Sequence, residues 1–360
     1  MMSEQANASS TPYSFSSSSP LEILAFGEAM ALLVAESEGD LAQVSHYERR
    51  IAGADTNVAI GLARLGFHVG WLSRVGDDSL GRYLRQTLED NGLDCRHLTR
   101  DGDAPTGLMF KARASQGEDP HVEYFRQGSA ASRMNASDAD GIDFSALRHL
   151  HATGIPPAIS PSCRELSFHL FEQARQSGAS ISFDPNLRPT LWSSEQEMRD
   201  TLNQLASRAD WVLPGLAEGE RLTGQKTPEA IAGHYLEQGA KAVIIKLGPE
   251  GSYYRGMIGG QEAAFSVPGL RVDKVVDTVG AGDAFAVGVV SALLEGLSPK
   301  DAMHRANLLG SRAVQVRGDM EGLPDRATLK ALEAGDAVRS VHRPRSQGGK
   351  DACTALLGPR

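Results

Sequence analysis

The run Asp277-Thr278-Val279-Gly280-Ala281-Gly282-Asp283 carries the strongest chemical signal in the sequence. It leads directly into an apolar stretch, residues 284–294, that is typical of a buried helix. Glycines just before a helix let several backbone N–H groups converge, and the helix start adds partial positive charge, so the segment predicts an anion site. A phosphoryl group in transfer spreads negative charge that such donors stabilise. Asp283 could accept the proton of an attacking hydroxyl, although aspartate is also a favoured helix cap.

The elements around this run alternate between strand and helix. Apolar strand patterns cover residues 147–153, 179–184, 211–213 and 242–247, and helical spacing covers 162–177, 195–207 and 227–238. Such alternation predicts an α/β fold with a mostly parallel sheet between two helical layers, with ligands beyond the carboxyl ends of the strands. Two early β segments, 29–52 and 106–127, fall outside this rhythm and are expected to form a small β lid over that edge.

Composition excludes several classes of function. There are 36 Lys and Arg against 45 Asp and Glu, a net charge of −9, which argues against a nucleic-acid partner. No apolar run reaches the roughly 18 residues of a membrane span. The three cysteines form no CxxC pair, which favours a reducing, cytoplasmic setting. The Ser-rich residues 1–20 and the Arg-, Pro- and Gly-rich residues 340–360 are expected to be disordered tails.

The two common nucleotide loops are missing. GxxxxGK[ST] does not occur, and GAGDAF lacks the third glycine of the dinucleotide fingerprint. DTVGAGDAF instead resembles the C-terminal signature of the ribokinase-like (PfkB) carbohydrate kinases. GADTNVA at 53–59, LARLG at 62–66 and RVGDD at 74–78 resemble further motifs of that family in order and spacing. The resemblance implies a lidded, ribokinase-like kinase domain over residues 21–335. It also implies Asp283 as catalytic base and the amides of Gly280, Ala281, Gly282 and Asp283 as the anion hole.

The resemblance also implies ATP and Mg²⁺. Lys246, Gly248 and Gly251 match the family's KxGxxG turn beside ATP, and Asn307 matches a position near the adenine; a tight turn leaving a strand is the alternative for the first three. Glu218 keeps the acidic end of an Asn-x-x-Glu motif that helps to organise magnesium, while Gly215 replaces the asparagine. Asp277, Val279 and Gly318 are the positions whose backbone would contribute to a site for a monovalent cation such as K⁺.

Two arginine-bearing segments bear on the substrate. Arg126 follows Tyr124 at the end of the second lid segment, and Arg188 follows a predicted strand. A guanidinium donates two parallel hydrogen bonds to a carboxylate, so the pair favours a sugar acid over a neutral sugar. Alternatively, each arginine pairs with a structural carboxylate, or Arg188 with ATP phosphate. These segments look most like those of 2-keto-3-deoxygluconate kinases, which implies that Tyr124, Arg126 and Arg188 surround the acid while Gly53 and Asn57 hold the sugar hydroxyls.

The expected activity is therefore ATP-dependent phosphorylation of 2-dehydro-3-deoxy-D-gluconate on its 6-hydroxyl. Kinases of fructose or of 5-dehydro-2-deoxygluconate are the nearest alternatives. A non-catalytic sensor of sugar acids is an alternative of another class, favoured only by Gly215. An exposed lid edge could also pair between subunits, which predicts a homo-oligomer.

Overall fold

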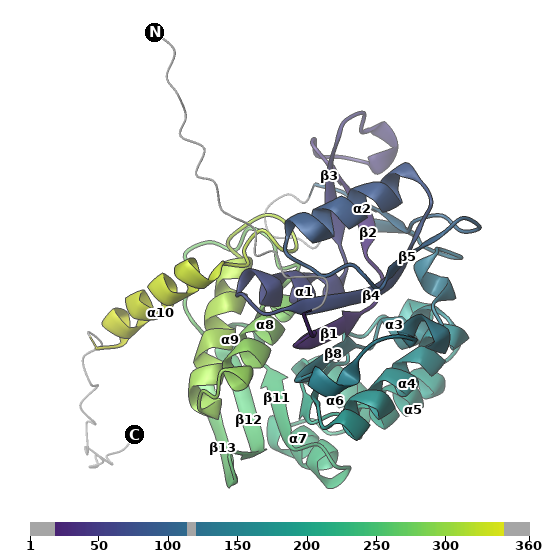
Figure 1. Ribbon diagram of the computed structural model, residues 1–360. Coiled ribbons are helices and arrows are strands. Elements are labelled where there is room, and N and C mark those ends of the chain that lie inside the picture. Colours follow the sequence, from purple (N-terminus) through teal and green to yellow (C-terminus); the bar gives the residue numbers. More distant parts are fainter. Residues whose placement is uncertain (1–18, 114–119, 342–360) are drawn as a thin grey trace, which may run out of the picture.

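The computed structural model describes residues 19–113 and 120–341. A nine-stranded sheet crosses the molecule in the order β13-β12-β11-β10-β9-β8-β1-β4-β5 (Figure 1). The strands from β5 to β11 run parallel, and β12 and β13 are antiparallel. The strand bounds are β1 (Ile23–Phe26), β4 (Val69–Gly76), β5 (Leu98–Asp101), β8 (His149–Thr153), β9 (Ser180–Asp184), β10 (Trp211–Val212), β11 (Ala242–Lys246), β12 (Gly251–Ile258) and β13 (Gln261–Pro268).

Helices cover both faces of this sheet. Alternate residues of β1 enter different cores: Ile23 and Ala25 pack on one face, and Leu24 and Phe26 on the other, because successive strand side chains point in opposite directions. The first core is closed by α1 (Ala54–Arg64), α2 (Ser79–Asp90), α8 (Ala281–Leu294), α9 (Pro299–Ala313) and α10 (Arg326–Val341). The second lies under α4 (Pro161–Ser177), α5 (Glu195–Ala206), α6 (Leu216–Thr223) and α7 (Pro228–Glu237), with the short α3 (Pro156–Ile159) before α4. The predicted three-layer α/β/α fold is confirmed.

A second, four-stranded sheet forms the lid, in the order β3-β2-β6-β7. Its strands are β2 (Met30–Ala35), β3 (Tyr47–Ala52), β6 (Leu108–Lys111) and β7 (Val122–Phe125), and all lie within the two predicted lid segments. The β2–β6 pair is parallel and the other two pairs are antiparallel. A small apolar cluster that includes Met30, Leu32 and Met109 gives the lid a core of its own.

Short 3-10 turns connect these elements. They are η1 (Leu41–Gln43), η2 (Ala131–Arg133), η3 (Ala136–Ala139), η4 (Phe144–Ala146), η5 (Pro189–Leu191) and η6 (Gly248–Glu250). Within the described residues, no helix is both long and apolar enough to cross a bilayer.

The β12–β13 hairpin was not predicted, although its turn carries a readable signal. Ile258 pairs with Gln261, so the loop is Gly259-Gly260, and both glycines have positive φ, 71° and 82°. Consecutive glycines suit the tight hairpin turns whose twist matches that of the strands. At the other end of the domain, α10 runs to Val341, past the predicted limit at residue 335. Nearly all of the two predicted tails, 1–20 and 340–360, lies outside the described residues.

Candidate active site

A cleft of about 530 Å³ opens between the lid and the carboxyl ends of the parallel strands. Lys246, the last residue of β11, and Asn186, which follows β9, both line the cleft. Met30 and Met109 face it from the lid, and the first turns of α1 and α8 reach it from the side. This is the edge at which open α/β sheets bind their ligands.

Asp283 lies in the first turn of α8 and lines the cleft, although its side chain is largely buried. The Nδ2 of Asn57, on α1, donates a hydrogen bond of 2.7 Å to its Oδ2. Burial raises the pKa of the Asp283 carboxyl to about 7, and the Asn57 hydrogen bond opposes that rise because it stabilises the charged form. A carboxylate poised near neutral pH has the properties of a general base.

Gly280 caps α8 in a left-handed conformation, with φ of 77°. A Cβ at this position would overlap the carbonyl oxygen of Asp319, so glycine is required on two grounds. The first amides of a helix have no intrahelical partner, and that of Ala281 makes only a 3.4 Å contact with Thr278 O. Gly280 and Gly282 line the cleft, while Ala281 does not. The predicted anion site thus faces the cleft on two of its glycines and on Asp283.

Lys246 brings positive charge to this helix start. Its Nζ lies 3.7 Å from where a Cβ on Gly282 would stand. The same ammonium pairs with Asp184 Oδ2 at 2.6 Å and lies 3.9 Å from Glu218 Oε2. Glu218 is itself fixed, because its Oε1 accepts from Leu187 N at 2.8 Å and its Oε2 from Gly215 N at 2.7 Å. The structure therefore brings Lys246 and Glu218 together beside the α8 amides.

The other predicted nucleotide residues lie outside this cleft. Gly248 begins the η6 turn, and Gly251, with φ of 106°, pairs with Pro268 at the end of β13. Asn307 donates from Nδ2 to Val267 O at 3.2 Å and to Pro268 O at 3.3 Å. Gly251 and Asn307 thus meet at one corner of the sheet, where they hold the end of β13. Their role toward ATP stays a prediction, and the tight-turn alternative describes what Gly251 does here.

The predicted sugar residues gather at the cleft. Gly53, Asn57, Tyr124, Arg126 and Arg188 all line it. Among the described residues no carboxylate pairs with Arg188, whose hydrogen bond goes to Leu187 O at 2.9 Å.

Arg126 is already paired. Its Nη2 lies 2.5 Å from Oε2 of the buried Glu28, which agrees with the alternative that this arginine meets a structural carboxylate. Arg126 Nε is buried and has no partner in the described part of the chain. Arg188 is consequently the freer of the two guanidinium groups, and Arg126 retains one unused donor.

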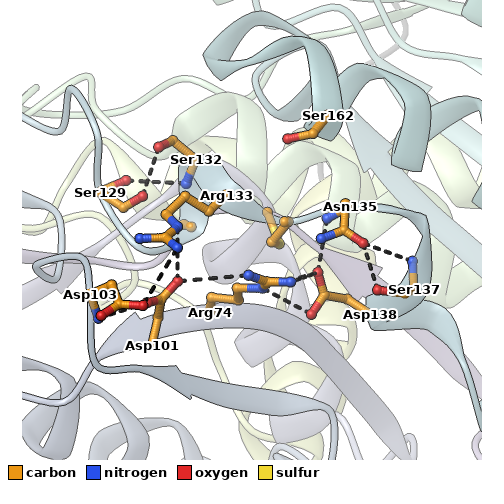
Figure 2. A network of polar contacts seen from close by, with 12 residues as sticks. Arg74, Asp101, Asp103, Ser129, Ser132, Arg133, Asn135, Ser137, Asp138 and Ser162 are labelled. Carbon is orange, nitrogen blue, oxygen red and sulfur yellow. Dashed lines mark hydrogen bonds and ion pairs between the residues drawn. The ribbon is translucent and has the colours of Figure 1, made fainter.

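A polar network fixes the segment that follows Arg126. The Ser129 hydroxyl donates to Glu28 Oε1, and the Ser129 carbonyl accepts a hydrogen bond from Ser132 Oγ. Figure 2 shows Arg74 and Arg133 reaching carboxylates beside this turn: Arg74 pairs with Asp138 at 2.8 Å and Arg133 with Asp101 at 3.2 Å. The Glu28–Arg126 pair is thereby anchored to the ends of β4 and β5. Arg74, part of the RVGDD motif, acts structurally in this network.

A family model described as "pfkB family carbohydrate kinase" matches residues 21–326, nearly all of the described chain. The chain belongs to the pfkB family of carbohydrate kinases. It is 48% identical to the 2-dehydro-3-deoxygluconokinase of Bacillus subtilis, over 90% of this chain and 98% of that protein. A 2-dehydro-3-deoxygluconokinase of Thermoproteus tenax is 33% identical, over 87% of this chain and 95% of its own length.

Solved structures agree with this family. A PfkB protein from Polaromonas sp. JS666 superposes with a TM-score of 0.79 at 50% identity, over 86% of this chain and 99% of that chain. A putative ribokinase II from E. coli, solved with ATP and Mg²⁺, gives a TM-score of 0.77 at 26% identity, over 88% and 99%. A double mutant of a Vibrio cholerae fructokinase, solved with fructose, ADP and potassium, gives a TM-score of 0.74 at 29% identity, over 87% of this chain and 98% of that chain.

The metal positions of this pfkB kinase can be tested against the side chains. Within residues 19–113 and 120–341, no group of three or more His, Cys, Asp or Glu could hold a metal alone. One fixed carboxylate, Glu218, with substrate phosphates and water would suit Mg²⁺, which keeps several waters in its shell. At the monovalent-cation positions, Val279 N binds Asp277 Oδ1 at 3.1 Å, while Lys111 Nζ lies 2.8 Å from Asp277 Oδ2. Asp277 thus already faces a protein cation.

Four charged residues of the cleft were missed from the sequence: Glu28, Asp55, Lys111 and Asp319. Glu28 comes soon after β1, so the carboxyl-end rule applied to that strand would have found it. Lys111 ends an apolar lid strand, where a buried lysine calls for a partner. Asp55 is buried against Thr153, and burial raises the pKa of its carboxyl to about 8. Asp55 lies inside the GADTNVA motif at 53–59, but nothing in that motif marks this aspartate for burial, and no local pattern separates Asp319 from an ordinary surface aspartate.

Proposed function

We propose that this pfkB kinase transfers the γ-phosphate of ATP to the 6-hydroxyl of 2-dehydro-3-deoxy-D-gluconate. The observation that carries the proposal is the placement of Asp283: a buried carboxyl with a pKa of about 7, at a helix N-terminus, in the same cleft as Arg188, which meets no carboxylate within the described ranges. The similarity to the two named 2-dehydro-3-deoxygluconokinases supports this substrate over other sugars.

In the proposed reaction, the 6-hydroxyl oxygen attacks the γ-phosphorus and its proton passes to Asp283. A new O–P bond forms while the bond to the β–γ bridging oxygen breaks, and ADP leaves with that electron pair. The amides of Gly280 to Asp283 and the Lys246 ammonium stabilise the charge that develops on the phosphoryl oxygens. Mg²⁺, bound through phosphate and oriented by Glu218, would add charge neutralisation.

The acid end of the substrate lies on the lid side of the cleft in this proposal. Arg188, which meets no carboxylate among the described residues, offers its guanidinium to the substrate carboxylate, while Arg126, held by Glu28, adds positive charge to the same cleft. Tyr124 lines the same wall from β7, and its ring lies 5.9 Å from the Arg126 guanidinium. Asn57 and Gly53 are left for the sugar hydroxyls, so Asn57 would touch both the base and the substrate.

ADP release measured across a panel of sugars and sugar acids tests this function. The panel contains 2-dehydro-3-deoxygluconate, its galactonate epimer, 5-dehydro-2-deoxygluconate, fructose and ribose, and ³¹P NMR of the product locates the phosphate. We expect the highest kcat/KM with 2-dehydro-3-deoxygluconate and a 6-phosphate product. A higher value with fructose or 5-dehydro-2-deoxygluconate would replace the substrate, and tight binding without any ADP would identify a sensor.

Asp283→Asn is the matched variant for this assay, because it preserves shape and removes the base. We expect kcat to fall by about 10²-fold or more, the usual scale for a general base, with ATP affinity nearly intact. Near-normal turnover would remove Asp283 from the mechanism while leaving the substrate assignment standing.

We further propose that two lids pair in a homo-oligomer and that the protein works in the cytoplasm. In the described part of the chain, β3 and β7 are the edge strands of the lid sheet, and Tyr124 and Phe125 on β7 are about half exposed in the single chain, at 49% and 58%. Light scattering of Phe125→Glu against the unchanged protein tests the pairing, since a charge should favour the monomer.

The free, buried thiols of Cys95 and Cys163 support a reducing compartment.

A further inference from the structure

Lys111 is an internal cation placed between two loops of the catalytic domain. It ends lid strand β6 and is 5% exposed. Its Nζ lies 2.8 Å from Asp277 Oδ2 and 3.5 Å from Asp319 Oδ1, and both carboxylates are themselves buried or nearly so. One ammonium therefore serves two carboxylates that would otherwise repel each other across the gap.

These two loops shape the start of α8. Asp277 leads into Gly280 through Val279, and the carbonyl of Asp319 packs against Gly280 so closely that no Cβ fits. Whatever holds Asp277 and Asp319 together therefore sets where the amides of α8 point. Lys111 makes contact with both.

A metal cation fits poorly at this position. The resemblance placed a monovalent cation against the backbone of Asp277, Val279 and Gly318, and the Vibrio cholerae fructokinase was solved with potassium. Here the Asp277 carboxylate already faces an ammonium at hydrogen-bond distance, so an added K⁺ would lie beside a like charge. A second lid cation, Arg50, donates to Arg317 O and to Glu321 Oε1, both at 3.2 Å, directly beside Gly318.

We propose that Lys111 replaces the monovalent cation in this kinase, so that its activity does not depend on K⁺. Lys111 is then a positioning residue, which keeps the α8 amides aimed at the cleft through Asp277 and Asp319. Because Lys111 belongs to the lid, the position of the lid and the geometry of the anion site are coupled. The proposal rests on the phosphoryl transfer proposed above.

The direct test exchanges the cation in the assay. For the unchanged protein we expect the same kcat in chloride salts of potassium, sodium or tetramethylammonium. Lys111→Met should lose about 10- to 100-fold of kcat in tetramethylammonium, the usual cost of removing a group that orients a site. Potassium or methylammonium should restore much of that loss, since either can enter the vacated space between the carboxylates. Lys241→Met is the control, because Lys241 also pairs with an aspartate but at the exposed start of β11.

A second readout separates this proposal from the proposed function. The melting temperature of Lys111→Met should rise with added K⁺ but not with tetramethylammonium, whereas that of the unchanged protein should respond to both salts alike. Strong activation of the unchanged protein by K⁺, or a Lys111→Met variant that keeps full kcat without K⁺, would overturn the proposal. If Lys111→Met does not fold, Lys111→Arg keeps the charge and should remain K⁺-independent. Inactivity toward every sugar would refute only the function, because the melting temperatures would still test the cation.

Discussion

Removal of the Asn57 side-chain amide should move the pH dependence of the reaction upward. Asn57 donates its 2.7 Å hydrogen bond to the charged form of Asp283, whose pKa burial raises to about 7. A hydrogen bond to a charged group contributes about 1.5–3 kcal/mol, and about 1.4 kcal/mol corresponds to one pH unit. Asn57→Leu, which has a similar shape and no donor, should therefore raise the midpoint of the acid limb by about 1 to 2 pH units.

The sign follows from which form of Asp283 is active. The base must be deprotonated, so kcat/KM falls as pH drops through its pKa, and a higher pKa moves that loss to higher pH. At pH 7 the variant should be slower by about 5- to 50-fold than the unchanged protein, and it should recover toward alkaline pH. A loss of sugar contacts alone would instead lower the profile by the same factor at every pH.

The assay follows product directly over about pH 6 to 10, a range that covers the acid limb and the plateau above it, with ATP and magnesium saturating. Product formation by ³¹P NMR avoids coupling enzymes, whose own pH dependence would distort the profile. Thr56→Val is the matched control, since Thr56 lies next to Asn57 on α1 and its buried Oγ1 has no partner in the described part of the chain. An unmoved midpoint in Asn57→Leu, with circular dichroism showing an intact fold, would refute the coupling of Asn57 to the base.

Three further predictions address the helix cap, the acid site and stability. Gly280→Ala should lower both kcat and the melting temperature. Gly296→Ala is the control, because Gly296 follows the other end of α8 with a similar φ of 78° and open space around it; it should cost only about 1–2 kcal/mol of strain and leave kcat unchanged. Equal losses of kcat and melting temperature in the two variants would show that crowding against Asp319 does not matter at Gly280. Arg188→Ala should raise KM for the sugar acid far more than KM for fructose, and by more than Arg126→Ala raises it. An equal rise in KM for both sugars would contradict the acid-binding role of Arg188. Because the pKa of Asp55 lies near 8 in the fold against 3.8 ordinarily, the native state holds an extra proton between those pH values, and stability falls as pH rises. Asp55→Asn should flatten that slope, by up to about 1.4 kcal/mol per pH unit in urea unfolding, and an unchanged slope would show that Asp55 stays ionised.

The fold and the placement of the glycine-rich start of α8 at the cleft were predictable because their signals are local. Glycines before an apolar helix identify Gly280 and Asp283 from adjacent residues, and strand and helix periods give the layers of the sheet. The residue pairs that set the electrostatics of the cleft have no such local signal. Asn57 and Asp283 are 226 residues apart, and Lys111 and Asp277 are 166 apart, so only the folded topology brings them together.

Arg126 illustrates what remains undetermined without the fold. Its segment is consistent with a substrate ligand or with a structural ion pair, because the guanidinium chemistry is the same in both. The outcome depends on where Glu28 ends up after β1, 101 residues before the Ser129 that orients it. Asn307 shows the same limit, since its amide holds the end of β13, a strand that had not been anticipated.

The two helices that carry Asn57 and Asp283 are deeply buried. Residues 54–63 of α1 are buried throughout, and so are residues 283–292 of α8. Asp283 therefore cannot shift without repacking the interior, whereas most lid positions pack on the lid's own small core and, Lys111 apart, can change independently. Laboratory evolution toward new sugars should accordingly collect substitutions on β2, β6 and β7 and leave α1 and α8 nearly untouched.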